Sequence, residues 1–143
     1  MKIGVITDGI SRDFEHALKV MDEFGLEYAE LQFVWDKEIG FLETAEVSRA
    51  KKLLKQYGKQ VSNICHHIFA GMRMTSKPGD ELHTQHMDRL KRCMEIAHEL
   101  GSPRVRILSP KKEQVLFGAN GAEKWNVAKG AWDALPPLIS PAV

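Results

Sequence analysis

The pattern of hydrophobic and polar positions along the chain predicts four units, each made of a strand and a following helix. Short β-branched runs or alternating apolar and polar residues predict strands at 2–7, 28–35, 60–69 and 104–109. Apolar residues three or four positions apart predict amphipathic helices at 11–25, 44–58 and 80–101. A fourth helical pattern begins at about Trp125, and Pro136 and Pro137 are expected to kink or end it.

Residues at the predicted helix ends support these assignments. Ser11 and Thr44 stand where an N-cap accepts backbone hydrogen bonds, and Gly25 and Gly101 stand at the C-terminal cap positions. We expect the apolar residues of the third helix to face the core: Leu82, Met87, Leu90, Met94, Ile96, Ala97 and Leu100.

The order of these elements indicates an α/β fold. No hairpin signal separates successive strands, so we expect the strands to pair in parallel through right-handed helical crossovers. No low-complexity tract and no shift in composition divides the chain, and the sequence therefore predicts a single domain over residues 1–143.

Composition narrows the classes of partner. Twenty basic and nineteen acidic side chains leave a formal charge of +1, which argues against nucleic acid or a membrane surface as the partner. No apolar run approaches the roughly 20 residues of a membrane span, and the start of the chain does not read as a signal peptide. Cys65 and Cys93 lack a C-x-x-C spacing, so we expect no disulfide framework and a cytoplasmic location.

Four segments carry a family resemblance: "KIGVITDG", "GLEYAELQF", "YGKQVSNICHHIF" and "IAHELGSPRVRILS". They resemble the first four βα units of the sugar phosphate isomerase/epimerase family, which has the xylose isomerase-like TIM-barrel fold and is related to endonuclease IV. The resemblance implies a parallel (βα)4 unit equivalent to the first half of a (β/α)8 barrel. Because a complete barrel takes about 250 residues, we expect this chain to stop after the fourth unit.

The resemblance also implies a chemistry. Family members move a proton next to a carbonyl of a sugar or sugar phosphate, and they bind a divalent metal (Mn, Mg, Zn or Co) through Glu, Asp, His and Glu at the ends of later strands. Those later strands are not expected in these 143 residues. We therefore expect no metal site in this chain and no activity from it in isolation.

Active sites of such barrels lie at the carboxyl ends of the strands, which selects the candidate residues. Glu30 shares a strand face with Gln32 and is expected either to bind sugar hydroxyls or to form a structural ion pair. Arg106 needs a carboxylate or phosphate partner, and Glu30 or a substrate phosphate would serve. Trp35 is expected either to line the sugar site or to pack in the core. Weaker candidates are Asp8 and the loop residues Arg73, Lys77, Lys111 and Lys112.

His66 and His67 follow each other in the third predicted strand, where neighbouring side chains point to opposite faces. Ile64 and Ile68 share the parity of His66 and suit the layer beneath the helices, which favours His67 in the barrel mouth. A bulge or an early strand end would invert this assignment. For His67 we rank a substrate contact first, a polar strand end second and a metal ligand third.

Three functions remain open at this stage. The first is the amino-terminal half of a metal-dependent sugar isomerase or epimerase. The second is a non-catalytic half-barrel that binds a carbohydrate-like ligand or pairs with a second copy, because a half-barrel has bare sheet edges. The third and weakest is a relative of the DNA-repair endonuclease, which the balanced charge disfavours.

Overall fold

The computed structural model describes residues 3–72 and 76–109, and it contains one parallel sheet of four strands. The strands are β1 (Gly4–Ile6), β2 (Tyr28–Leu31), β5 (Gln60–Cys65) and β6 (Val105–Arg106), and they lie in the order β1-β2-β5-β6. Each strand therefore pairs with its predecessor among them, as predicted for successive strand-then-helix units.

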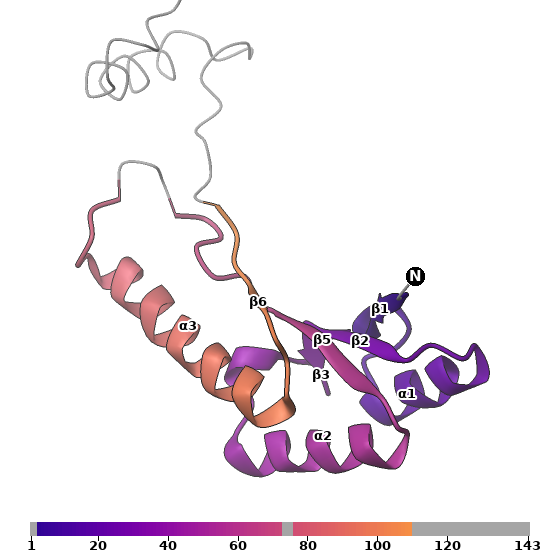
Figure 1. Cartoon of the computed structure of the whole chain (residues 1–143). Helices are drawn as coiled ribbons and strands as arrows, with labels where there is room; N and C mark the ends of the chain where they lie inside the picture. The colour runs from indigo at the N-terminus through magenta and orange to yellow at the C-terminus, as the bar shows by residue number, and fades with distance from the viewer. Residues whose placement is uncertain (1–2, 73–75, 110–143) are drawn as a thin grey trace, which may run out of the picture.

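Three helices connect the strands: α1 (Phe14–Glu23), α2 (Thr44–Gln56) and α3 (Glu81–Leu100). All three lie along one face of the sheet, and the described residues leave the opposite face uncovered (Figure 1). This is the layering expected for part of an α/β barrel, where helices form the outer layer and the other sheet face lines the interior.

The hydrophobic core lies between the sheet and these helices. From the sheet it includes Ala29, Leu31 and Ile64, all at 0% exposure, and Val61 at 5%. The helices contribute residues at helical spacing that are also buried, namely Leu18, Met21, Val47, Leu54, Cys93 and Ile96. Burial of such side chains contributes about 1.5–3 kcal/mol each, and this layer is the main source of stability in the described part.

A register shift in the third strand of the sheet keeps its apolar residues on the covered face. Ala29 lies opposite Val61, but the next residue, Glu30, lies opposite Asn63, so β5 contains one extra residue at this point. The bulge explains why Val61 and Ile64, which differ in parity, are both buried. It lies before the histidines, and from Ile64 onward the alternation is that predicted from sequence.

The predicted strand over 28–35 is wrong in its second half. β2 ends at Leu31, and a separate antiparallel hairpin follows, formed by β3 (Phe33–Val34) and β4 (Lys37–Glu38). Trp35 and Asp36 form its turn at φ values of 50° and 62°. Two consecutive left-handed residues are typical of a type I′ turn, which usually contains Asn or Gly, and the prediction therefore missed it.

Several predicted element ends also need correction. The N-cap of α1 is Asp13, whose carboxylate accepts from the backbone of Glu15 and His16, and not Ser11. The N-cap of α2 is Glu43, which forms a capping box with Glu46, and Thr44 is the first helical residue. Strand β5 ends at Cys65, before both histidines, and β6 covers only two of the six residues predicted for the fourth strand.

The third helix matches the predicted bounds but not the whole predicted inward face. Ile96 and Ala97 are buried, and Gly101 ends the helix at φ 71°, as expected for a left-handed C-cap. Leu82 and Met94 are 45% and 58% exposed, and Cys93 takes a buried position that the prediction had not assigned. The helical pattern from about Trp125 lies outside the described residues.

The remaining short elements are two 3-10 turns, η1 (Thr7–Gly9) after β1 and η2 (Ile39–Phe41) after the hairpin. None of the helices in the described ranges is both long and apolar enough to span a bilayer.

Candidate functional site

The carboxyl ends of β1, β2 and β5 bring polar residues from different parts of the chain to one edge of the sheet. Asp8 follows β1, Gln32 follows β2, and His66 and His67 follow β5. The β3–β4 hairpin follows β2 directly in the chain, and its last residue, Glu38, belongs to the same group.

Glu38 and His67 form the closest side-chain contact at this edge. One carboxylate oxygen of Glu38, Oε1, lies 2.6 Å from Nδ1 of His67 and accepts a hydrogen bond of 2.7 Å from the backbone N–H of the same residue. On the other side of the ring, Nε2 of His67 lies 3.2 Å from the amide nitrogen of Gln32. Glu38, His67 and Gln32 therefore form a continuous row of hydrogen-bonding groups.

Aromatic and charged neighbours surround this row. The ring of Phe33 lies 6.3 Å from that of His67, and the guanidinium of Arg12 stacks over Phe33 at 4.0 Å. Asp8 accepts a hydrogen bond of 3.3 Å from the backbone N–H of Phe33. Asp8 therefore helps to position the hairpin that carries Glu38.

His66 points to the opposite side and is 4% exposed. Its ring packs beside Phe41 at 5.3 Å, and its Nδ1 lies 3.5 Å from Glu38 Oε1 but has no hydrogen-bond partner. Burial lowers the pKa of His66 below its ordinary value of 6.5, against the raising effect of Glu38. His66 is therefore neutral at neutral pH.

Glu30 and Arg106 meet on the open face of the sheet, across β5. An N–H nitrogen of Arg106 lies 3.6 Å from Glu30 Oε1, and that oxygen is buried with no hydrogen-bond partner. The pair is loose, and the Arg106 side chain is 47% exposed. A partly exposed pair of this kind contributes little stability, so both groups retain hydrogen-bonding capacity for a ligand.

Cys65 lies next to Arg106 in the sheet register and is 1% exposed. Burial raises the pKa of its thiol, and the neighbouring Arg106 guanidinium opposes that shift. Cys93, on the buried face of α3, has its pKa raised by burial to about 12. Neither thiol is in a setting that favours a nucleophile.

Trp35 does not join the other predicted site residues. It lies in the hairpin turn, where its ring makes an edge-to-face contact with Phe14 of α1 at 5.8 Å. The guanidinium of Arg49 from α2 stacks on the same ring at 4.4 Å. Of the two roles expected for Trp35, these contacts favour packing against the helices over a wall for a sugar ring.

The weaker loop candidates add little. Lys77 lies in the described part, where its backbone N–H donates to Asp80 just before α3. Arg73, Lys111 and Lys112 lie outside the described residues.

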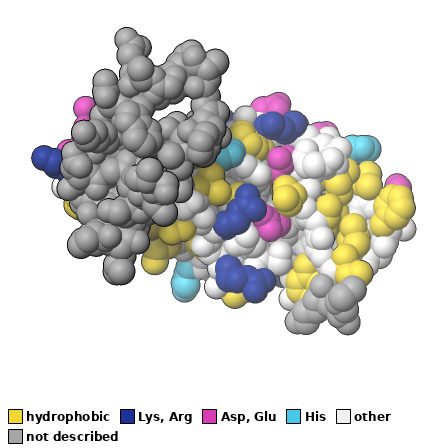
Figure 2. All heavy atoms as spheres, turned by 90° about the horizontal axis from the view of Figure 1, so that it is seen from above, with side chains coloured by type: hydrophobic (Ala, Val, Ile, Leu, Met, Phe, Trp, Pro, Cys, Tyr) yellow, Lys and Arg dark blue, Asp and Glu magenta, His cyan; other side chains and the backbone are white. Residues whose placement is uncertain are grey.

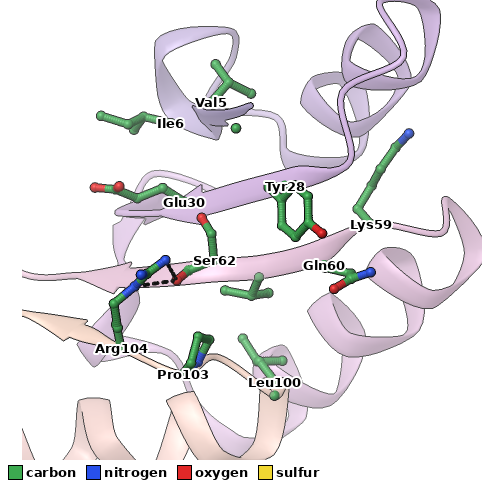
Figure 3. A pocket seen from close by; sticks show the side chains of 13 residues that line it. Val5, Ile6, Tyr28, Glu30, Lys59, Gln60, Ser62, Leu100, Pro103 and Arg104 are labelled. Atoms are coloured by element: carbon green, nitrogen blue, oxygen red, sulfur yellow. Dashed lines mark hydrogen bonds between the residues drawn. The ribbon is translucent and has the colours of Figure 1, made fainter. Parts of the chain in front are cut away.

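Two hollows in the described part of the molecule lie near these groups, and His67 lines neither of them. The larger, of about 820 Å³, lies over the open face toward the amino ends of the strands. Figure 3 shows Tyr28, Glu30 and Ser62 projecting from the sheet there, and Arg104 donating to the Ser62 carbonyl at 3.2 and 3.3 Å. The smaller, of about 420 Å³, lies between η2 and α3 and includes His66, Phe41 and Arg89.

A metal ion does not fit the described residues by themselves. In residues 3–72 and 76–109, no three His, Cys, Asp or Glu side chains converge as a metal site requires. Glu38 Oε1 is engaged by the backbone N–H and the Nδ1 of His67. The other ring nitrogen, Nε2, lies against the side-chain amide nitrogen of Gln32. The residues described thus favour hydrogen bonding over metal ligation.

Glu38 is the residue that sequence reasoning missed. The sequence pattern predicts one continuous strand over 28–35, and this conceals the hairpin that carries Glu38. The only local signal in "FVWDKE" is Asp36, because Asp is a residue that tolerates a left-handed conformation in a turn.

No curated protein matches this chain significantly. A family model described as "Xylose isomerase-like TIM barrel" matches residues 18–138, and the parallel β1-β2-β5-β6 sheet with helices on one face agrees with it. The chain therefore belongs to the xylose isomerase-like TIM barrel family.

Proposed function

We propose that this chain forms the sugar-binding part of an isomerase or epimerase that acts on a sugar or sugar phosphate. The observation that carries the proposal is the row Glu38–His67–Gln32 beside the loose Glu30–Arg106 pair, on the edge and open face of one parallel sheet. Polyols are recognised by such planar groups, which donate and accept several hydrogen bonds in fixed directions.

Each group has a defined contribution in this proposal. Gln32 and Nε2 of His67 would exchange their mutual hydrogen bond for hydrogen bonds to sugar hydroxyls. Glu30, whose Oε1 has no hydrogen-bond partner, would accept from a further hydroxyl. Arg106, which is only loosely paired, would bind a phosphate or the anionic end of the substrate.

The proposal assigns no metal to these residues. Proton transfer next to a carbonyl needs an acid–base group and a means of stabilising the enolate oxygen, which in the family is supplied by a divalent metal. The described residues are proposed to bind and orient the sugar, and the stabilisation of the enolate oxygen is not assigned to them.

The test is a titration with D-fructose and D-fructose 6-phosphate, followed through the imidazole carbon–proton resonances of the six histidines. Saturable shifts are expected at His67 and not at His16, which is exposed on α1 and serves as the matched control. Arg106→Gln should weaken the phosphate ester by about tenfold or more, the value of one charge-assisted hydrogen bond, and change fructose binding little. Equal shifts at both histidines, or none, would contradict the proposal.

A second candidate function is a half-barrel that a second copy completes, and the uncovered sheet face favours it. Figure 2, a view from above Figure 1, shows basic and acidic side chains side by side among hydrophobic ones. Ile6 in β1 and Ile107 beyond β6 are 38% and 48% exposed, so apolar surface lies at both edges of the described sheet. Because β1 and β6 run parallel, a two-fold axis along the strands would pair β1 of each copy with β6 of the other.

Sedimentation velocity at several protein concentrations tests this second candidate. A dimer is expected, and Ile6→Glu should dissociate it because it places a charge at the sheet edge. A monomer at all concentrations would exclude pairing between copies, whereas sugar binding by that monomer would leave the first proposal intact.

A further inference from the structure

We propose that Glu38 is a positioning residue, whose carboxylate fixes His67 in the tautomer that carries its proton on Nδ1. Nε2 is then always the hydrogen-bond-accepting nitrogen at the carboxyl ends of the strands. The use of this nitrogen on a sugar rests on the function proposed above, but the tautomer itself does not.

The first support is the geometry of the contact. The same oxygen of Glu38 receives the backbone N–H of His67 at 2.7 Å and lies 2.6 Å from its Nδ1. A carboxylate can only accept, so a bond at this distance requires the proton on Nδ1. The two contacts to one residue also fix the orientation of the ring relative to its own backbone.

Burial strengthens this contact on one side only. The side chain of Glu38 is 13% exposed, whereas that of His67 is 49% exposed. The carboxylate charge of Glu38 is thus largely removed from water, while the imidazole of His67 is still accessible to solvent and to a ligand. A charge-assisted hydrogen bond in such a setting is about twice as strong as a neutral one.

The second support comes from the opposite side of the ring and is independent of Glu38. The amide nitrogen of Gln32 lies 3.2 Å from Nε2 of His67. An amide N–H₂ group only donates, so Nε2 must present its lone pair. Both neighbours of His67 therefore require the same tautomer.

Gln32 and Glu38 are held together by the hairpin. The backbone N–H of Ile39, the residue after Glu38, donates to the carbonyl of Gln32 at 2.8 Å. The tight turn at Trp35 and Asp36 returns the chain over this short distance. The β3–β4 hairpin thus brings an acceptor and a donor to the two sides of one imidazole.

His66 does not compete for the carboxylate at neutral pH. Its Nδ1 is 3.5 Å from the same oxygen of Glu38, too far for a strong hydrogen bond, and the ring is buried. Desolvation is the largest influence on the pKa of His66 and lowers it; Glu38 opposes that shift, whereas Arg89, His67 and His86 act in the same direction as desolvation. Because His66 stays neutral, the charge of Glu38 remains directed at His67.

The arrangement suits a group that accepts a proton. If a ligand hydroxyl replaces Gln32 at Nε2 and transfers its proton there, the O–H bond breaks, an N–H bond forms, and the imidazolium keeps its Nδ1–H bond to Glu38. The carboxylate then stabilises the positive charge, and the same proton can return to the ligand.

Long-range proton–nitrogen NMR spectra of the whole chain test the inference, because they report which nitrogen of each histidine is protonated. At a pH where the ring is neutral, His67 is expected as the Nδ1–H tautomer, which is the minor form of free histidine. Glu38→Ala should shift His67 toward the free mixture, whereas Gln32→Ala should retain the Nδ1–H form because Glu38 remains. His16 should be unchanged in every variant.

An Nε2–H tautomer of His67 in the wild-type chain would overturn the inference, and this measurement stands even if Glu38→Ala does not fold. An unchanged His67 spectrum in folded Glu38→Ala would also overturn it. The outcome is separable from sugar binding: a correct tautomer without sugar binding removes only the proposed function, and sugar binding with the other tautomer removes only the role of Glu38.

Discussion

Successive residues of β2 and β5 face either the helices or the open side of the sheet, and the two sides differ in composition. Ala29, Leu31 and Ile64 on the covered face are at 0% exposure. Glu30 and Ser62 project into the hollow over the open face, where Arg106 is also exposed. The covered face supplies stability, whereas the open face carries the polar groups that a ligand or a partner would use.

The same contrast is repeated beyond the end of β5 in two consecutive histidines. His66 is 4% exposed and packs toward η2 and α3, whereas the side chain of His67 is 49% exposed and is held by Glu38 and Gln32. Identical side chains thus have different chemistry because alternation directs one into the core and the other toward solvent. Four predictions test this comparison between the faces.

The largest effect is expected for an isoleucine on the covered face. Ile64→Ala should lower the free energy of unfolding by about 2–5 kcal/mol, because it removes buried methylene groups and leaves a cavity. Ile6→Ala, on the open face at 38% exposure, should cost less than about 1 kcal/mol. Urea denaturation followed by circular dichroism measures both.

The Ile6 variant also distinguishes a free open face from a paired one. If a second copy covers that face, the loss for Ile6→Ala should approach that of Ile64→Ala and should depend on protein concentration. A small loss for Ile64→Ala would contradict the position of the core described above.

The next effect is expected at Gly40, where the covered face meets α3. A Cβ atom there would lie 2.7 Å from Cδ of Arg89, 2.9 Å from Sγ of Cys93 and 3.0 Å from Nδ1 of His66. Gly40→Ala should therefore cost about 1–3 kcal/mol through overpacking. Thermal unfolding measures the change.

Gly9→Ala is the matched control, because nothing lies within 4 Å of its Cβ position. It should be neutral or stabilising by up to about 1 kcal/mol, since alanine restricts the unfolded chain more than glycine does. If Gly40→Ala lowers the free energy of unfolding no more than Gly9→Ala does, the packing around Gly40 is looser than described.

The parts of the fold that follow from periodicity could be predicted from sequence. The strands around Val5, Ala29, Ile64 and Val105, their parallel order and the third helix all rest on apolar runs of the correct period, and the structure confirms them. The inward face of the third helix was only partly predicted. Met94 is exposed, and the smaller Cys93 occupies the buried position, because the angle at which α3 meets the sheet is not encoded in its own pattern.

The candidate site was less predictable because it depends on a hairpin of four paired residues. Glu38 reaches His67 only through the turn at Trp35 and Asp36, and neither residue is glycine. Alternation alone favours His67 in the barrel mouth, but it carries no information about a carboxylate 29 positions earlier in the chain. Contacts between distant segments of this kind require the three-dimensional arrangement.

A smaller effect is expected from the protonation of His66. Its pKa in the folded state lies below the ordinary value of 6.5, so the unfolded chain binds more protons in the interval between the two values. The free energy of unfolding should therefore fall as the pH decreases through 6.5 toward the folded-state pKa, and this loss is absent at higher pH. Urea denaturation at a series of pH values measures it.

His66→Gln should reduce this pH dependence, because a buried neutral side chain replaces the titrating one. His16→Gln, on the exposed side of α1, is the control for the substitution itself, and the change in pH dependence should be larger for His66→Gln than for His16→Gln. A His66→Gln variant with the wild-type pH profile would show that His66 does not titrate in this range.

The smallest effect concerns the two thiols and involves no change in stability. Cys93 is at 0% exposure on the buried face of α3, with a pKa raised to about 12, whereas Cys65 is 1% exposed beside Arg106, whose charge favours the thiolate. Both should react slowly with iodoacetamide in the folded chain, and Cys65 should react several-fold faster than Cys93. Peptide mass spectrometry of the wild type, with Cys65→Ser and Cys93→Ser for assignment, measures the two rates. If Cys93 reacts first, the open face is better protected than the covered one, and the contrast between the two faces does not hold at this end of the sheet.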